Sequence, residues 1–119
     1  MNNIDPHKIS ALLKQASQEF ILPRYQSLKG DEIATKTGPR DLVTAADIEA
    51  EKFLTRVLPD LLPGSIVVGE EGVSNGTASL ASLKTHSGPI WVVDPVDGTF
   101  NFANGTEHFG IMVALVNKQ

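Results

Sequence analysis

Residues 91–102 run Trp91-Val-Val-Asp94-Pro-Val-Asp97-Gly-Thr-Phe-Asn-Phe102, an apolar segment that passes into two carboxylates, a glycine and a threonine. The aromatic and β-branched residues at its start predict a buried strand. Pro95 cannot donate a hydrogen bond to a sheet, so we expect the strand to end near Asp94. Asp94 and Asp97 would then stand at the end of a rigid element, where a site can be held in a fixed geometry.

The residues that follow this strand point to phosphate chemistry. Carboxylates are the ligands that Mg²⁺ takes in proteins, usually together with phosphate oxygens of the substrate. Gly98 lets backbone amides approach an anion closely, and Thr99 adds a hydroxyl. The motif therefore favours metal-assisted phosphoryl chemistry. A purely structural turn remains an open alternative, because Asp-Pro and Asp-Gly pairs are also common in turns.

A second strand with an acidic end precedes the first, in Ser65-Ile-Val-Val-Gly69-Glu70-Glu71-Gly72. Neighbouring side chains of a strand point to opposite faces. If the strand continues through both glutamates, one is a ligand, and the other orients a neighbour or meets solvent. Solvated glutamates are the ordinary alternative, since charged residues are seldom buried. Two strands that each end in acids and glycine favour a shared site.

A third motif, Asp41-Leu-Val-Thr44-Ala-Ala-Asp47, predicts the start of a helix. Thr44 and Asp47 have the spacing of a capping box. Asp47 therefore has a sufficient structural role, accepting backbone amides at the positive end of the helix dipole. The helix is expected to end near Leu58 and to bury a stripe at helical spacing: Ala50, Phe53, Leu54, Val57, Leu58 and Leu61.

The remaining segments complete an α+β layout. Asp5-Pro6 predicts the start of a first helix, which Pro23 ends or kinks. Residues 33–35 predict a short strand, and residues 72–88 a surface loop with one helical turn. Residues 109–116 are apolar on both strand faces, as in a strand covered on both sides, and the chain stops soon after them. We expect two N-terminal helices packed on a mainly antiparallel sheet.

Composition limits the possible functions. The chain has 119 residues, a net charge of −4 and no cysteine. One domain at most is expected, nucleic-acid binding is disfavoured, and a disulfide framework is excluded. Neither a signal peptide nor an apolar membrane span is recognisable, so a cytoplasmic location is the default. The three histidines show no zinc-site spacing.

Together, Asp41 to Asp47, Gly69-Glu-Glu71 and Asp94 to Phe102 closely resemble the inositol monophosphatase family of Mg²⁺-dependent, lithium-sensitive phosphatases. The resemblance covers nearly the whole chain. It implies an α/β/α/β/α layered fold, usually dimeric, with a domain about twice as long. Residues 1–119 would then be the N-terminal portion of one such domain, whose absent C-terminal half supplies a further aspartate.

The resemblance also assigns roles to individual residues. Glu70, Asp94 and the carbonyl of Val96 would hold one Mg²⁺, and Asp94 and Asp97 a second, with two or three ions per site. Glu70, Thr99 and Asp47 would polarise the attacking water, and Lys36 would balance charge nearby. The substrate would meet Glu70, Val96, Asp97, Gly98 and Thr99, the last two binding phosphate through their backbone amides.

The predicted function is Mg²⁺-dependent hydrolysis of a phosphate monoester by metal-activated water. The substrate would be a small phosphorylated metabolite, inositol monophosphate or a related sugar or nucleotide phosphate. A 3′-phosphonucleotidase or a fructose-bisphosphatase remains possible within this class. We expect no nucleic-acid or membrane partner, and a homodimer for the complete protein. The alternative is a truncated, catalytically inactive cation-binding or assembly module.

Overall fold

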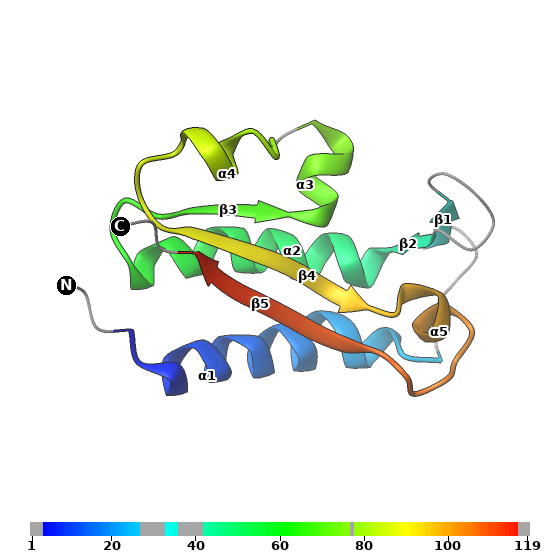
Figure 1. Cartoon of the computed structure of the whole chain (residues 1–119). Coiled ribbons are helices and arrows are strands. Elements are labelled where there is room, and N and C mark those ends of the chain that lie inside the picture. Colours follow the sequence, from blue (N-terminus) through cyan, green and yellow to red (C-terminus); the bar gives the residue numbers. More distant parts are fainter. Residues whose placement is uncertain (1–3, 27–32, 36–41, 77, 117–119) are drawn as a thin grey trace.

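A computed structural model describes residues 4–26, 33–35, 42–76 and 78–116. Two long helices, α1 and α2, lie on one side of a three-stranded sheet (Figure 1). This arrangement confirms the predicted α+β class. In chain order the elements are α1 (Pro6–Ala16), η1 (Ser17–Ile21), η2 (Leu22–Arg24), β1 (Ile33–Thr35), β2 (Leu42–Thr44), α2 (Ala45–Val57), η4 (Leu58–Leu61), β3 (Ile66–Gly69), α3 (Glu70–Asn75), α4 (Ser82–Thr85), β4 (Ile90–Asp97), α5 (Thr99–Ala103) and β5 (Gly110–Val116).

Both long helices begin as their sequences predict. Asp5 accepts a hydrogen bond from the His7 N–H at 2.9 Å at the start of α1, and Pro6 follows as the first helical residue. At the start of α2, the Thr44 N–H donates to Asp47 Oδ2 at 2.9 Å, and the Asp47 N–H donates to Thr44 Oγ1 at 3.4 Å. These two bonds form the predicted capping box. No helix among the described residues is both long and apolar enough to cross a membrane.

The larger sheet is mixed. β3 pairs with β4 in parallel, and β4 pairs with β5 in antiparallel orientation, while β1 and β2 form a separate antiparallel pair. A parallel pair needs a crossover connection, and α3 and α4 lie within it. The prediction of a loop over residues 72–88 was therefore wrong at its start, where α3 continues to Asn75 and ends at Gly76 with φ +84°. The predicted helical turn in this segment corresponds to α4.

Strand β4 continues beyond the predicted end at Asp94. It runs to Asp97, with a bulge between the pairs Asp94↔Met112 and Asp97↔Gly110. A bulge is a position where a strand tolerates proline, because the extra residue makes no ladder hydrogen bond. Pro95 occupies this bulge and is fully buried. The prediction erred because it treated the proline as a strand end rather than as a bulge residue.

The core fills the space between the two helices and the sheet. Phe53 and Leu54 of α2 pack there with Trp91 and Val93 of β4, and the Trp91 indole N–H donates to Ser65 Oγ at 3.1 Å. The predicted strand over residues 109–116 is present as β5, but its burial alternates. One face contributes to this core, whereas Met112 on the other face is 55% exposed. In the described part of the chain, β5 is therefore covered on one side rather than two.

Candidate active site

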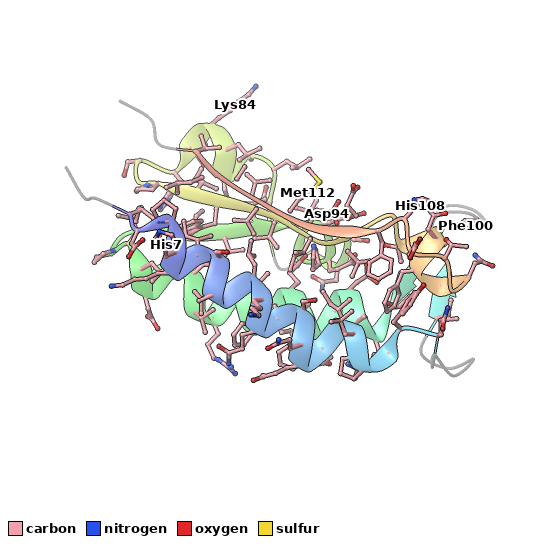
Figure 2. All side chains as sticks on the ribbon, turned by 90° about the horizontal axis from the view of Figure 1, so that it is seen from below. His7, Lys84, Asp94, Phe100, His108 and Met112 are labelled. Carbon is pink, nitrogen blue, oxygen red and sulfur yellow. The ribbon has the colours of Figure 1, made fainter. Side chains whose placement is uncertain are left out.

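The bulge in β4 brings Asp94 and Asp97 to the same face of the sheet. In a regular strand, residues three positions apart face opposite sides. Here three steps along β4 match two steps along β5, from Met112 to Gly110, so the extra residue restores a common face. The Asp97 charge accordingly acts on Asp94. Figure 2 shows Asp94 beside Met112, its register partner, with His7 and His108 toward opposite ends of the molecule.

Glu70 joins this pair from the neighbouring strand. Because β3 and β4 are parallel, both end at the same edge of the sheet, and Gly69 pairs with Val93. Glu70 is therefore next to Asp94 across the two strands, and their side chains hydrogen-bond to each other. β3 ends at Gly69, so the two glutamates open α3 instead of alternating along a strand. Glu70 is exposed, whereas Glu71 is buried, with 7% of its surface accessible.

Asp94 is held in an environment that opposes its ionisation. Burial, followed by the charge and hydrogen bond of Glu70 and the charges of Asp97 and Asp47, raises the pKa of Asp94 from 3.8 to about 7. Its Oδ1 atom is buried and has no hydrogen-bond partner. An unpartnered buried carboxylate oxygen among like charges is unfavourable unless a cation offsets it. The arrangement thus fits a cation with oxygen ligands.

Asp47 and Thr99 form the floor of the site. Asp47 is fully buried, and this burial raises its pKa despite hydrogen bonds from Thr44 and Thr99, which lower it. The Thr99 hydroxyl lies 2.8 Å from Asp47 Oδ1 and 2.9 Å from the Val96 carbonyl oxygen. A hydroxyl has one proton to donate, so it serves one of these acceptors at a time. When it serves Asp47, the Val96 carbonyl is left with its lone pairs for another partner.

Gly98 makes the turn between β4 and α5, and no other residue fits there. Its φ of +89° lies in the left-handed region that favours glycine, and a Cβ would stand 2.6 Å from the His108 carbonyl oxygen. Asn101 Nδ2 also donates to that carbonyl, at 2.9 Å. The close approach of Gly98 and the hydrogen bond of Asn101 both fix the turn against the His108 carbonyl. The backbone amides of Gly98 and Thr99 are thereby kept next to Asp97.

The structure brings most of the sequence-predicted residues together. The charges of Asp47, Glu70 and Asp97 all act on Asp94, and Val96, Gly98 and Thr99 adjoin these residues. Lys36 lies outside the described residues. Within the described ranges, no three acidic or histidine side chains stand in the geometry of a single cation site; as arranged, Glu70 and Asp94 hydrogen-bond to each other directly.

A groove of about 390 Å³ adjoins this acidic cluster on the exposed face of the sheet. Glu70 and Asp94 contribute to its wall, but most of the lining residues are apolar, among them Val73, Leu80 and Met112. Such a surface offers few partners to a phosphorylated polyol. The candidate site is therefore the acidic cluster with the Gly98 turn, rather than the apolar part of the groove.

Sequence reasoning missed Glu51. This α2 residue is buried, and its carboxylate accepts hydrogen bonds from the Glu71 N–H at 2.8 Å and the Gly72 N–H at 2.6 Å. One signal was available, because Glu51 is four residues after Asp47 and so lies on the same face of the helix. A glutamate on a core-facing part of a helix calls for a partner.

The chain is similar to known proteins in both sequence and fold. A profile of the inositol monophosphatase family matches residues 5–119. An inositol-1-monophosphatase from Bacillus subtilis (strain 168) is 34% identical over 103 residues, which make up 87% of this chain and 36% of that protein. A Thermotoga maritima IMPase has a TM-score of 0.75 at 26% identity, covering 96% of this chain and 40% of that one.

A second solved structure is similar in the same way. It is described as an IMPase/NADP phosphatase complexed with Mg²⁺ and phosphate, with a TM-score of 0.72, 25% identity, and coverage of 94% of this chain and 39% of that one. The chain thus spans well under half the length of each relative, and it matches them over most of its own length. By its family profile, its sequence relatives and its fold, this chain belongs to the inositol monophosphatase family.

Proposed function

We propose that this site belongs to a Mg²⁺-dependent phosphomonoesterase. The observation that carries the proposal is the buried, unpartnered Asp94 Oδ1 atom, which lies among the charges of Glu70, Asp97 and Asp47. A cluster of this kind raises the free energy of the folded chain unless cations offset the repulsion. The donor set consists of oxygen atoms, which suits Mg²⁺ rather than a softer metal.

Four residues can supply oxygen ligands to the ions. Glu70, Asp94 and the Val96 carbonyl would hold one Mg²⁺, and Asp94 and Asp97 would reach a second, within a complement of two or three ions. Bound Mg²⁺ supplies positive charge that lowers the pKa of water and draws electron density from the phosphate oxygens. The structural relative described as complexed with Mg²⁺ and phosphate supports Mg²⁺ as the cation.

The remaining residues would position the substrate and the water. The amides of Gly98 and Thr99 would hold the phosphate oxygens, because the fixed turn keeps them beside Asp97. The Thr99 hydroxyl donates to Asp47 Oδ1, which leaves Thr99 Oγ1 able to accept a hydrogen bond from the attacking water. Glu70 would accept a second hydrogen bond from that water. Asp47 thus holds the Thr99 hydroxyl in the orientation that general base assistance requires.

The proposed substrates are inositol monophosphate and related sugar or nucleotide phosphates. The Bacillus subtilis relative, an inositol-1-monophosphatase, supports the first, and the relative described as an IMPase/NADP phosphatase supports the wider range. Lithium sensitivity, a homodimeric complete protein and a cytoplasmic location stay predictions of the same proposal.

Phosphate release from inositol 1-phosphate tests the proposal. The 119-residue chain is assayed with Mg²⁺ and with a chelator, beside Asp97→Asn and the control Asp60→Asn, which removes the same charge from an exposed residue away from the site. The proposal expects Mg²⁺-dependent release that Asp97→Asn abolishes and Asp60→Asn retains. Release that survives in Asp97→Asn contradicts it. Mg²⁺ binding without release favours the inactive cation-binding module.

A further inference from the structure

We propose that Glu51 is a positioning residue that clamps the first turn of α3 and thereby holds Glu70 against Asp94. The inference rests on the proposed function, because Glu70 matters to the chemistry only if the acidic cluster binds cations. It assigns a role to a buried carboxylate that the catalytic scheme above leaves unused.

Two buried carboxylates on one face of α2, Asp47 and Glu51, make hydrogen bonds at the ends of β4 and β3. Asp47 and Glu51 are separated by one turn of α2, about 6 Å along the helix axis. Asp47 reaches the end of β4 through Thr99, and Glu51 reaches the end of β3 through the Glu71 and Gly72 amides. α2 packs along both strands, as Figure 1 shows.

Glu51 acts as the cap that α3 lacks locally. The N-cap residue of α3 is Gly69, which has no side chain to accept from the helix's first amides. Such amides need a partner when they are buried. Each oxygen of Glu51 takes one of them: Oε1 lies 2.8 Å from the Glu71 nitrogen, and Oε2 lies 2.6 Å from the Gly72 nitrogen. Both are charge-assisted hydrogen bonds, which are shorter and stronger than neutral ones.

The glycine before Glu70 makes room for this carboxylate. A Cβ at Gly69 would stand 2.3 Å from Glu51 Cδ and 2.4 Å from its Oε1. The φ of Gly69 is −112°, which any residue adopts. Space for Glu51, rather than backbone conformation, therefore requires glycine at this position.

The clamp fixes the backbone on the C-terminal side of Glu70. Glu70 is exposed, so packing does not hold its side chain. It is the first residue of α3, between the strand end at Gly69 and the amide of Glu71 that Glu51 holds. With these two points fixed, its side chain projects toward Asp94, where the two hydrogen-bond. Outer partners of this kind tune a metal site through the orientation of its ligands.

Two measurements on the full 119-residue chain test the inference: hydrogen exchange of the Glu71 and Gly72 amides by NMR, and Mg²⁺ affinity by calorimetry. In Glu51→Ala we expect both amides to exchange faster and Mg²⁺ affinity to fall about tenfold or more. Glu51→Gln should be intermediate, because it keeps one acceptor oxygen in place of two and loses the negative charge. Asp5→Ala is the matched control, since it removes a helix cap far from the site and should leave Mg²⁺ affinity unchanged.

A double-variant cycle separates the clamp from a general loss of stability. Gly69→Ala should reproduce the effects of Glu51→Ala, because the new methyl group displaces the carboxylate. In the Glu51→Ala background, the same change should have little further effect.

Each contrary result is specific. Unchanged exchange of the two amides in Glu51→Ala overturns the clamp. If the two amides exchange faster in Glu51→Ala but Mg²⁺ affinity stays at the wild-type value, Glu51 is a helix cap only, and the positioning role is overturned. A wild-type chain that binds no Mg²⁺ refutes the proposed function, and the exchange measurement then decides alone whether Glu51 holds the turn.

Discussion

Replacing Asp94 by asparagine should stabilise the metal-free chain at neutral and alkaline pH. The carboxylate is held among Glu70, Asp97 and Asp47, and burial and these neighbours raise its pKa from 3.8 to about 7. An aspartate with a raised folded-state pKa keeps a proton that the unfolded chain releases, so stability falls as pH rises between the two values. Asparagine removes the charge, and its amide group can still donate to Glu70.

The size of the effect follows from the shift. The pKa of Asp94 rises from 3.8 to about 7. At about 1.4 kcal/mol per pH unit, the whole shift corresponds to a loss of roughly 4 kcal/mol in the free energy of unfolding. Asp94 as a residue is only half-buried, so solvent screening reduces this figure to about 1–2 kcal/mol. The variant should match wild type near pH 4, gain stability relative to it as pH rises, and keep a constant advantage above about pH 7.

Urea unfolding in a chelating buffer from pH 4.5 to 8.5 measures this difference. Asp60→Asn serves as the control, since the side chain that it changes is exposed. A difference that does not change with pH, or a variant less stable than wild type at pH 8, would refute the reasoning that like charges strain this site. Added Mg²⁺ should reverse the order by stabilising wild type and not the variant, because the proposed ions would bind the carboxylates of the folded chain only.

Three further substitutions test separate parts of the structure. Thr44→Ala should lower the free energy of unfolding by about 0.5–2 kcal/mol through loss of the α2 cap, measured by urea unfolding against the exposed control Thr55→Ala. Gly98→Ala should lower it by at least about 1–2 kcal/mol, because its φ is positive and its Cβ would meet a carbonyl at 2.6 Å; an unchanged midpoint would show that the turn relaxes. Ser65→Ala should cost about 1–3 kcal/mol by leaving the buried Trp91 indole N–H without its acceptor, and fluorescence-detected unfolding reports on that same indole.

Local signals in the sequence were sufficient for the elements that end in a recognisable cap or run of apolar residues. The capping box at Thr44 and Asp47 located the start of α2, and the β-branched runs located β3 and β4. The carboxylates that these elements carry were identified for the same reason, because they stand where the regular pattern stops. The structure gathers them at one edge of the sheet, as expected for parallel strands.

The features that could not be predicted depend on residues distant in the sequence. The bulge at Pro95 exists because β5 pairs on both sides of it, and nothing in residues 91–97 distinguishes it from a strand end. Helix α3 contains Gly72, lies between Gly69 and Gly76, and has no local side-chain cap, so its sequence favours a loop. Its amides are satisfied by Glu51, 20 residues before the first of them. Tertiary contact overrode local preference in both cases.

Asp47 and Glu51, the two α2 carboxylates that bond to separate strand ends, also bear on the order of folding events. The Asp47–Thr99 bond joins residues 52 apart, and the Glu51–Glu71 bond joins residues 20 apart. Contacts of such sequence separation form only after a large loop has closed. Asp47 therefore joins the acidic cluster only when the sheet docks on α2, whereas the pairing of β3 with β4 already brings Glu70 beside Asp94 and Asp97. We infer that divalent cations, held by Glu70, Asp94 and Asp97, would act on this chain chiefly by slowing the separation of β3 from β4.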